Sequence, residues 1–282
     1  MKIHRIETGK VRIKENQISK SGGVAPQMLY VLFGKEWSEW LPIYAWVIEH
    51  PEGVIVVDTG ETHKTSSRGY LPAWHPYYSL AVEFDVKQED EIGPQLSKIG
   101  IDPAKDVSKV IMTHMHTDHA GGLYHFPNSE IIIEKNEYKT ASGVTGMLAG
   151  YLPHRWPKWL NPTLITLPDH PYFSFSQSMA ATSDKKVMIV GTPGHVANHL
   201  SVTVEIDGVH YFIAGDTSYT EENLLQLIPD GVGTGQSRST LQNILSFAAS
   251  NPTVYLPSHD PLVPHRMENN KIVTSFQEII TS

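Results

Sequence analysis

The feature of this sequence that most constrains its fold is a short apolar segment followed at once by a dense group of polar residues. Residues 110–112 form an apolar run that is predicted to be a buried strand. Just after it, within six residues, come four side chains of types that bind divalent metal ions: His114, His116, Asp118 and His119. Imidazole and carboxylate groups suit zinc and similar ions. The chain must therefore place a polar, ligand-rich loop at the end of a buried strand.

The spacing of these residues favours two adjacent metal ions over one. Side chains alternate along an extended chain, so His114 and His116 should project to one side. Asp118 and His119 follow the strand end and can turn toward a second position. The alternative is a polar loop with ordinary surface histidines, since 15 of the 282 residues are histidine. A bare His-X-His pair would fit that alternative, but the full string, followed by two glycines, favours a metal site.

Three more candidate ligands follow later apolar segments. His195 ends a Thr-Pro-Gly-His string, Asp216 ends Ala-Gly-Asp, and His259 ends Pro-Ser-His. Each of them alone fits a hydrogen-bonded structural residue. Together they would supply a third ligand for each of two ions and a carboxylate between them. A bridging carboxylate offsets the repulsion between two cations that lie roughly 3.5–4 Å apart.

The composition excludes several classes of protein. The chain has no cysteine, which excludes disulfide scaffolds, thiol catalysis, cysteine-bound zinc and iron–sulfur clusters. Its formal net charge of −8 argues against nucleic acid as a partner, because phosphate binding needs a concentrated basic surface. No apolar stretch approaches the roughly 20 residues of a membrane span, and no signal-like segment is visible. We therefore expect a cytoplasmic protein with no membrane partner.

The apolar segments predict two strand-rich halves with helices between them. The expected strands are residues 28–33, 43–48, 54–57, 110–112, 130–134, 187–190, 200–205, 210–214 and 253–256. The expected helices are residues 88–99, 136–148, 221–227 and 241–249. Asp207-Gly208 is typical of a hairpin turn. This order favours an α/β layered sandwich over alternating βαβ units.

Two irregular segments, 61–84 and 149–175, are rich in aromatic residues. The first contains Tyr70, Trp74, Tyr77 and Tyr78, and the second contains five prolines together with Trp156 and Trp159. Loops of this length usually carry function or flexibility. Ordinary packing in a core or an interface is the alternative for these rings, and an aromatic-rich surface is compatible with a homodimer.

The ligand strings, in this order along the chain, resemble those of the metallo-β-lactamase-fold hydrolases. The matching strings are His-X-His-X-Asp-His at 114–119, Thr-Pro-Gly-His at 192–195, Gly-Asp at 215–216 and Ser-His at 258–259. The segment 58–60 (Asp-Thr-Gly) is similar to an early aspartate loop of that superfamily. The likeness spans about residues 25–262. It implies an αββα four-layer sandwich, one domain over residues 1–282, with a dinuclear metal site at the edge between the two β-sheets.

Within the superfamily, the chain resembles the N-acyl homoserine lactonases. They place a tyrosine three residues after the bridging aspartate, as Tyr219 follows Asp216 here, and His199 after Thr-Pro-Gly-His is also similar. Thr117 is a departure, because several of those lactonases carry phenylalanine there. The segment 149–175 is a possible second departure. Both bear on acyl-chain preference and leave the metal centre unaffected.

The resemblance implies a role for each candidate residue. One ion would be held by His114, His116 and His195. The second would be held by Asp118, His119 and His259, with Asp216 bridging the two. Zinc is the expected metal, and cobalt, manganese or iron would also fit these ligands. Tyr219 would donate a hydrogen bond to the substrate carbonyl, Asp118 would act as general acid, His199 would be structural, and Asp58 would support the ligand loop.

The implied reaction is hydrolysis of the lactone ring of N-acyl homoserine lactones, which is quorum quenching, by a metal-bridged hydroxide. Tyr219, Tyr70, Trp74 and Trp156 are the candidate substrate-binding residues, with 61–84 and 149–175 as pocket or lid segments. Alternatives on the same site are another lactonase or esterase, a glyoxalase-II-like thioesterase and an organophosphate hydrolase. A diiron redox protein and a metal-binding module without catalysis are alternatives from other classes. No G-x-S-x-G, Walker A or G-x-G-x-x-G string occurs.

Overall fold

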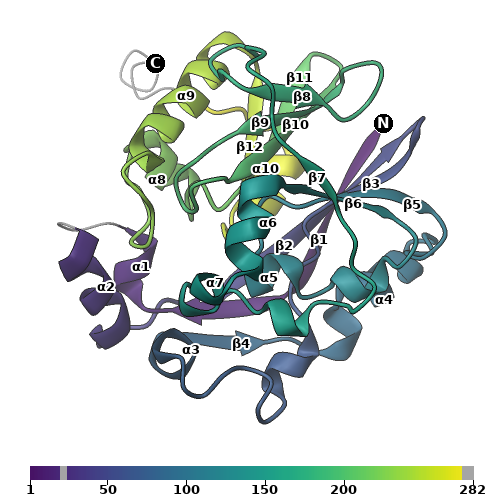
Figure 1. The fold of residues 1–282 in the computed structure, drawn as a ribbon. Coiled ribbons are helices and arrows are strands. Elements are labelled where there is room, and N and C mark those ends of the chain that lie inside the picture. Colours follow the sequence, from purple (N-terminus) through teal and green to yellow (C-terminus); the bar gives the residue numbers. More distant parts are fainter. Residues whose placement is uncertain (20–23, 275–282) are drawn as a thin grey trace. The chain divides into compact units, whose positions relative to one another are not determined.

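The computed structural model describes residues 1–19 and 24–274. The chain forms two units, each built on one β-sheet (Figure 1). The first unit contains residues 1–15 and 29–166. The second contains the described residues of 16–28 and of the chain from Leu167 onward. Sheets and helices occur in both units, which confirms the expected α/β class.

The sheet of the first unit has seven strands in the order β4-β1-β2-β3-β5-β6-β7. The strands are β1 (Lys2–Ile13), β2 (Leu41–His50), β3 (Gly53–Val57), β4 (Val82–Asp85), β5 (Val107–Ile111), β6 (Glu130–Glu134) and β7 (Thr163–Ile165). Strands β3 and β5 are parallel, with Val57 opposite Ile111. Their carboxyl ends therefore lie at the same edge of the sheet, and the ligand-rich loop after β5 leaves the sheet beside the loop after β3.

The helices of the first unit are shorter than the sequence predicts. They are α3 (Pro76–Leu80), α4 (Ile92–Lys98), α5 (Thr117–Ala120), α6 (Lys135–Ser142) and α7 (Val144–Leu148), with 3-10 turns η1 (His63–Ser66), η2 (Gln88–Asp90), η3 (Leu123–His125) and η4 (Pro153–Arg155). The helix expected over 88–99 is divided into η2 and α4. The helix expected over 136–148 is divided at Gly143, whose ψ of 167° is extended. Segment 61–84, expected as a loop, contains η1, α3 and part of β4.

The sheet of the second unit has five strands in the order β12-β11-β10-β9-β8. The strands are β8 (Ser178–Ala180), β9 (Val187–Gly191), β10 (Leu200–Ile206), β11 (Val209–Gly215) and β12 (Thr253–Pro257). Strand β10 is antiparallel to both β9 and β11, and β12 is parallel to β11. Strands β9, β11 and β12 thus run in one direction and end at the same edge. The predicted turn at Asp207-Gly208 is confirmed, with both φ angles positive at 52° and 81°.

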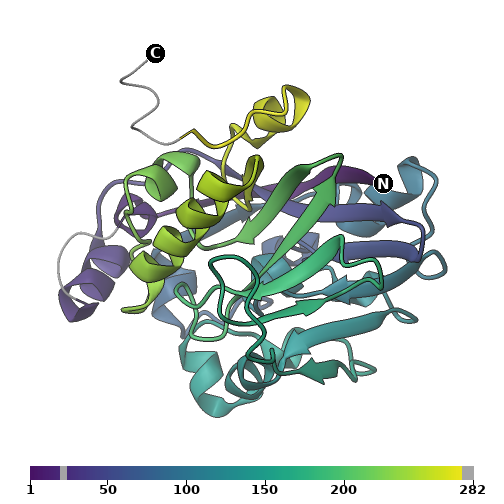
Figure 2. The same ribbon diagram turned by 90° about the horizontal axis from the view of Figure 1, so that it is seen from above.

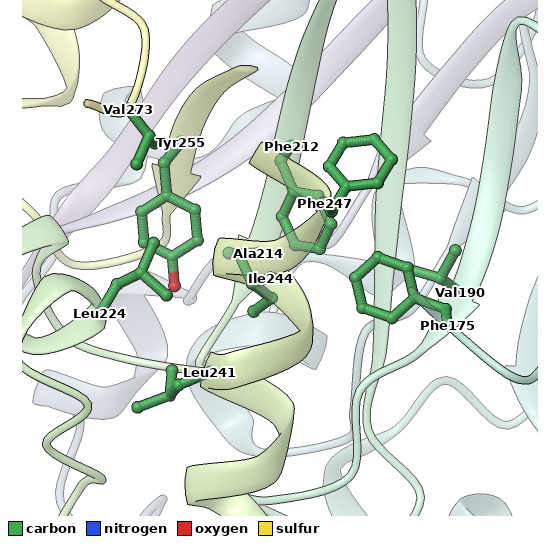
Figure 3. Packing of buried hydrophobic residues seen from close by; sticks show 10 residues of the cluster. All are labelled: Phe175, Val190, Phe212, Ala214, Leu224, Leu241, Ile244, Phe247, Tyr255 and Val273. Atoms are coloured by element: carbon green, nitrogen blue, oxygen red, sulfur yellow. The ribbon is translucent and has the colours of Figure 1, made fainter. Parts of the chain in front are cut away.

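A hydrophobic core supports the sheet of the second unit, whose strands β9, β11 and β12 lead to the candidate ligands. Its helices are α8 (Glu221–Leu225), α9 (Ser237–Ser250) and α10 (Val263–Glu268), and α9 lies along the sheet (Figure 2). Leu241, Ile244 and Phe247 recur along one face of α9 and pack in a cluster with Phe212 of β11 (Figure 3). The rings of Phe247 and Phe212 are 5.8 Å apart. This packing fixes the strands whose ends carry the candidate ligands.

The strand expected at residues 28–33 is wrong. These residues form the end of α2 (Val24–Phe33), which follows the short α1 (Glu15–Ile18). A short apolar run cannot be assigned to strand or helix by periodicity alone. Leu29, Tyr30 and Phe33 are 58%, 53% and 69% exposed, so this run is not a buried strand. Over the described residues, no helix combines the length and hydropathy that crossing a membrane requires.

Candidate metal centre

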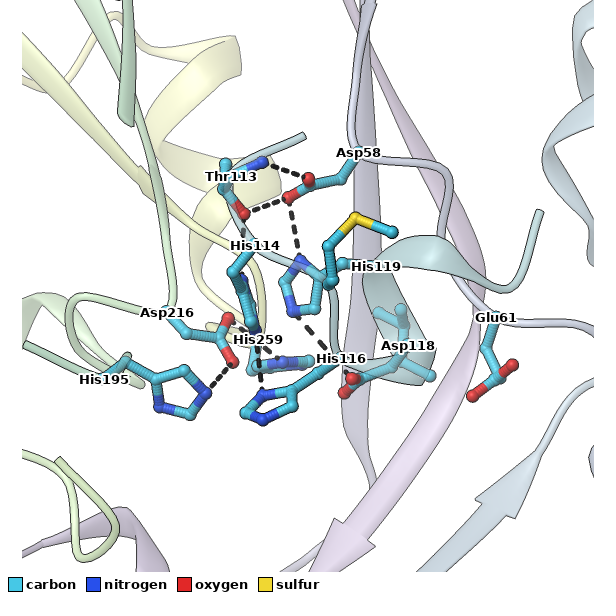
Figure 4. Close-up of polar contacts among 12 residues, drawn as sticks. Asp58, Glu61, Thr113, His114, His116, Asp118, His119, His195, Asp216 and His259 are labelled. Carbon is cyan, nitrogen blue, oxygen red and sulfur yellow. Dashed lines mark hydrogen bonds and ion pairs between the residues drawn. The ribbon is translucent and has the colours of Figure 1, made fainter. Parts of the chain in front are cut away.

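The candidate ligands of the first unit gather in two pairs after β5. The chain stays extended to His116 and then enters the single turn of α5, whose first turn carries Asp118 and His119. His114 Nε2 lies 3.1 Å from His116 Nδ1 (Figure 4). His119 Nε2 lies 4.0 Å from Asp118 Oδ1. These pairs match the two ligand sets that the sequence resemblance implies.

Asp58 supports this loop, as predicted. It follows β3 and adopts a left-handed backbone with φ of 56°, which aspartate tolerates better than most residues. Its Oδ1 accepts the backbone N–H of Thr113 and its Oδ2 accepts the Thr113 hydroxyl, both at 2.8 Å. The Oδ2 atom also lies 2.8 Å from His119 Nδ1. Asp58 therefore fixes the orientation of the His119 ring and directs its other nitrogen, Nε2, toward Asp118 (Figure 4).

The two glycines after the ligand string allow the close approach of a neighbouring loop. A Cβ atom on Gly122 would lie 2.3 Å from the carbonyl oxygen of Thr59, and one on Gly121 would lie 2.3 Å from Glu61 Oε1. Any larger side chain at either position would push the loops apart.

The Glu61 side chain beside Gly121 has a raised pKa. Burial is the main cause that raises the pKa of Glu61 to about 8, and the nearby Asp118 carboxylate raises it as well.

The candidate ligands of the second unit gather around Asp216. This residue follows Gly215, whose left-handed φ of 59° turns the chain at the end of β11. Asp216 Oδ2 lies 3.6 Å from His195 Nε2, and Asp216 Oδ1 lies 3.4 Å from His259 Nε2 (Figure 4). Each oxygen of the carboxylate thus faces a different imidazole. That is the arrangement expected of a carboxylate shared between two ions.

Two further residues hold this cluster in place. His195 Nδ1 is hydrogen-bonded to Asp230 Oδ2. His199 Nε2 accepts the backbone N–H of Asp216 at 3.2 Å, and its Nδ1 lies 2.9 Å from Thr192 Oγ1. The structural role predicted for His199 is confirmed. Sequence reasoning missed Asp230, which carries no local signal because it stands in an irregular segment between α8 and α9.

The donor sets of both units suit a divalent metal ion. Two ligands of one tetrahedral zinc ion lie about 3.4 Å apart, because zinc–ligand bonds measure about 2.0–2.2 Å. The separations within the two units are 3.1, 3.4, 3.6 and 4.0 Å, which bracket that value. A metal-binding histidine normally has its second ring nitrogen held by a carboxylate or a carbonyl. His119 and His195 meet this requirement through Asp58 and Asp230.

Tyr219 lies beside the second-unit cluster, three residues after Asp216. Its ring is 5.6 Å from the ring of His259, at an angle of 30°. Its hydroxyl oxygen accepts a hydrogen bond from Gln17 Nε2 at 2.8 Å. Sequence reasoning had no means to find this partner, because the two residues are 202 positions apart.

The first unit contains a pocket of about 190 Å³ beside α5. Its lining includes Thr117, between the candidate ligands His116 and Asp118, and two of the predicted substrate-binding residues, Tyr70 and Trp156. The full lining is Lys64, Tyr70, Thr117, Ala120, Gly121, Tyr124, Leu152, Arg155, Trp156 and Pro157. Trp74 does not line this pocket, and its side chain is 60% exposed.

A buried carboxylate in the first unit also escaped the sequence analysis. Glu91 Oε1 accepts the Thr62 hydroxyl and the backbone N–H of His63, both at 2.8 Å, and it lies 2.5 Å from His63 Nδ1. Glu91 Oε2 accepts the Tyr124 hydroxyl and lies 2.9 Å from His125 Nε2. Burial alone would raise the pKa of Glu91, but the hydrogen bonds from His125, Tyr124 and His63 outweigh it and hold that pKa well below its ordinary range.

Replacing Glu91 with glutamine is expected to lower the free energy of unfolding by about 2–3 kcal/mol at pH 7, because an amide group would face hydrogen-bond donors. The lowered pKa means that the folded protein binds fewer protons here than the unfolded chain. The difference between wild type and Glu91→Gln should therefore shrink as the pH falls below about 4.3. Urea unfolding at several pH values measures this difference in the free energy of unfolding. Glu89→Gln, at an exposed glutamate, is the control. If the two proteins differed in free energy of unfolding by the same amount at every pH, the stabilising role of the ionised Glu91 carboxylate would be contradicted.

A comparison with models of protein families matches residues 38–259 to the metallo-beta-lactamase superfamily. The chain belongs to this superfamily. The match covers the ligand strings of both units, from His114 to His259. A dinuclear metal site is characteristic of this superfamily.

Several known proteins are similar over most of their length. The N-acyl homoserine lactonase AiiA of Bacillus thuringiensis subsp. kurstaki is 26% identical over 247 residues, which cover 85% of this chain and 87% of that protein. AttM, an N-acyl homoserine lactonase of Rhizobium radiobacter, is 24% identical over 268 residues, which cover 93% and 94%.

The similar solved structures confirm the fold. An N-acyl homoserine lactone hydrolase with bound N-hexanoyl-L-homoserine has a TM-score of 0.70 at 21% identity, and the match covers 98% of this chain and 97% of that one. AidC, a dizinc quorum-quenching lactonase, has a TM-score of 0.58 at 15% identity, with 92% and 87% covered.

Proposed function

We propose that this protein hydrolyses the lactone ring of N-acyl homoserine lactones with two divalent metal ions, and that zinc is the metal. The arrangement of Asp216 is the main support, because its two oxygens face the imidazoles of His195 and His259 separately. The activities of AiiA and AttM, both N-acyl homoserine lactonases, indicate the substrate class. Neither a thioesterase, an organophosphate hydrolase nor a diiron redox protein is favoured by these relatives.

The proposed ligand sets are those that the sequence resemblance implies. His114, His116 and His195 would hold one ion, and Asp118, His119 and His259 would hold the other, with Asp216 shared. This assignment follows the pairing within each unit, where His114 lies beside His116 and Asp118 beside His119. One domain over residues 1–282 stays a prediction from the sequence.

In the proposed reaction, water adds across the ring C–O bond and yields a carboxylic acid and a free hydroxyl. When bound, two divalent ions supply a water molecule that loses its proton near neutral pH, and they polarise the ester carbonyl. Tyr219 donates its phenol proton in a hydrogen bond to the carbonyl oxygen, where negative charge develops. Asp118 takes up the proton that the water loses and returns it to the departing alkoxide.

A substrate panel tests the proposal. Purified protein loaded with zinc should release acid from homoserine lactones with C4 to C12 acyl chains, followed with a pH indicator. The same preparation is assayed with a glutathione thioester and a phosphotriester, and its metal content is measured. Turnover of lactones with two metal ions per chain supports the proposal. Turnover of the thioester or the phosphotriester alone would overturn the substrate assignment.

The pocket beside Thr117 is proposed to bind part of the acyl group. We expect Trp156→Ala to raise KM for C8 and longer lactones by roughly 3–10-fold, since burying one or two methylenes contributes about 1 kcal/mol, and to leave the KM for the C4 lactone little changed. The KM of Trp74→Ala for the same lactones shows whether the exposed Trp74 ring also binds the acyl group. Trp40→Ala, at another partly exposed tryptophan, is the control. Equal effects on C4 and C8 substrates would contradict an acyl-binding role.

The other assignments remain predictions from the sequence. They are a cytoplasmic location, a homodimer, and the lack of nucleic-acid and membrane partners. Sedimentation analysis of the purified protein tests the homodimer directly.

A further inference from the structure

We propose that Gln17 is a positioning residue for Tyr219, which it holds so that the phenol proton points to the substrate. The inference rests on the proposed role of Tyr219 in lactone hydrolysis. It concerns a residue outside every ligand string, near the start of the chain, that the structure groups with the second unit.

The contact itself sets the direction of the phenol proton. Gln17 Nε2 donates to the Tyr219 oxygen at 2.8 Å, and the two residues are only 4% and 5% exposed. A phenol oxygen that accepts a hydrogen bond keeps its own proton for a different acceptor. The incoming bond also polarises the O–H group and makes it a stronger donor. Both effects suit a hydroxyl that must stabilise negative charge on a carbonyl oxygen.

The backbone around Gln17 is anchored to the segment that also orients His195. The Gln17 carbonyl oxygen accepts the backbone N–H of Gly231 at 2.7 Å. A Cβ atom on Gly231 would lie 2.3 Å from the carbonyl oxygen of Asn16, so only glycine allows this approach. The residue before it is Asp230, which is bonded to His195 Nδ1. One loop thus positions a candidate metal ligand and, through Gln17, the candidate proton donor.

Two replacements of nearly equal size separate positioning from packing. Gln17→Met removes the donor and keeps most of the volume. Gln17→Glu keeps the shape and polarity but presents a carboxylate, which accepts the phenol proton and directs it away from the substrate. We expect kcat to fall about tenfold in Gln17→Met and further in Gln17→Glu, with KM changed less than threefold. A purely structural role predicts a loss of folded protein instead, with kcat per folded, metal-loaded molecule unchanged.

The experiment is a double-mutant cycle with Tyr219→Phe, which removes the hydroxyl. All variants are assayed on the most rapidly hydrolysed ester of the panel, and circular dichroism and metal content are recorded for each. We expect the Gln17 substitutions to have no further effect on kcat in the Tyr219→Phe background. Additive effects would overturn the inference. If both substitutions prevent folding, Gln17→Asn, whose amide is one methylene too short, is the third variant.

The outcomes separate the inference from the proposed function. If no lactone in the panel is hydrolysed but another ester is, the proposed substrate fails while the cycle still tests Gln17. If Tyr219→Phe lowers kcat and the Gln17 variants do not, the proposed function stands and the inference is overturned. If Tyr219→Phe has full activity, the role of Tyr219 is wrong and the inference fails with it.

Discussion

Replacement of His116 with alanine is expected to lower kcat/KM for lactone hydrolysis on the order of 10³-fold. His116 is one of the three unshared ligands proposed for its ion, and its Nδ1 lies 3.1 Å from His114 Nε2. Without it, that ion would keep two imidazoles and the shared carboxylate, so it should bind more weakly. Treatment with a chelator should remove activity to a similar extent, and addition of zinc should restore it to the wild type only.

Metal content and a matched histidine provide the controls for this experiment. The measured stoichiometry should fall from two ions per chain toward one in His116→Ala. His170→Ala, at an exposed histidine outside the ligand strings, should keep both ions and full activity. A His116→Ala protein with two bound ions and the wild-type rate would show that the chemistry takes place elsewhere.

Asp58→Ala is expected to reduce both stability and activity. The substitution removes the acceptor of three hydrogen bonds, from the Thr113 N–H, the Thr113 hydroxyl and the His119 ring. Buried donors left without acceptors cost about 1–3 kcal/mol each before the structure relaxes, so we expect a loss of about 3 kcal/mol in the free energy of unfolding. Loss of a carboxylate that orients a metal-binding histidine typically lowers activity about 10–100-fold.

Asp58→Asn distinguishes the effect on the His119 ring from the effect on folding. The amide oxygen can still accept the Thr113 N–H, so much of the stability should remain. The amide nitrogen would replace the oxygen that His119 Nδ1 faces. Because an amide N–H group donates hydrogen bonds, it would no longer favour the form of the ring with a proton on Nδ1. We therefore expect kcat/KM to fall nearly as far as in Asp58→Ala while urea unfolding shows a smaller loss. Equal retention of activity and stability would contradict the positioning role.

The local order of apolar and polar residues was enough to predict most of the strands. The runs at 43–48, 54–57, 130–134 and 187–190 are all strands, because continuous apolar runs bounded by turn residues suit strands covered on both faces. The run at 28–33 is also continuously apolar, but it is helical. A run of this length carries no period that distinguishes the two structures, and its environment decides between them.

The candidate ligands could be predicted because they follow strands whose carboxyl ends meet. Parallel pairing of β3 with β5 places Asp58 beside the His114–His119 loop, and parallel pairing of β11 with β12 places Asp216 beside His259. The residues that support them could not be predicted in this way. Asp230 and Glu91 are common residue types in segments without a motif, and only the folded chain shows which histidines they face.

The sequence by itself determined the chemistry that the chain can perform, because imidazole and carboxylate groups bind metals through atoms that each residue carries with it. Only the tertiary structure decided how those atoms are held. Orientation depends on partners such as Asp58 for His119 and Gln17 for Tyr219, 61 and 202 positions away. Such contacts arise from the packing of the whole unit, since a hydrogen bond depends on distance in space and leaves no pattern along the chain.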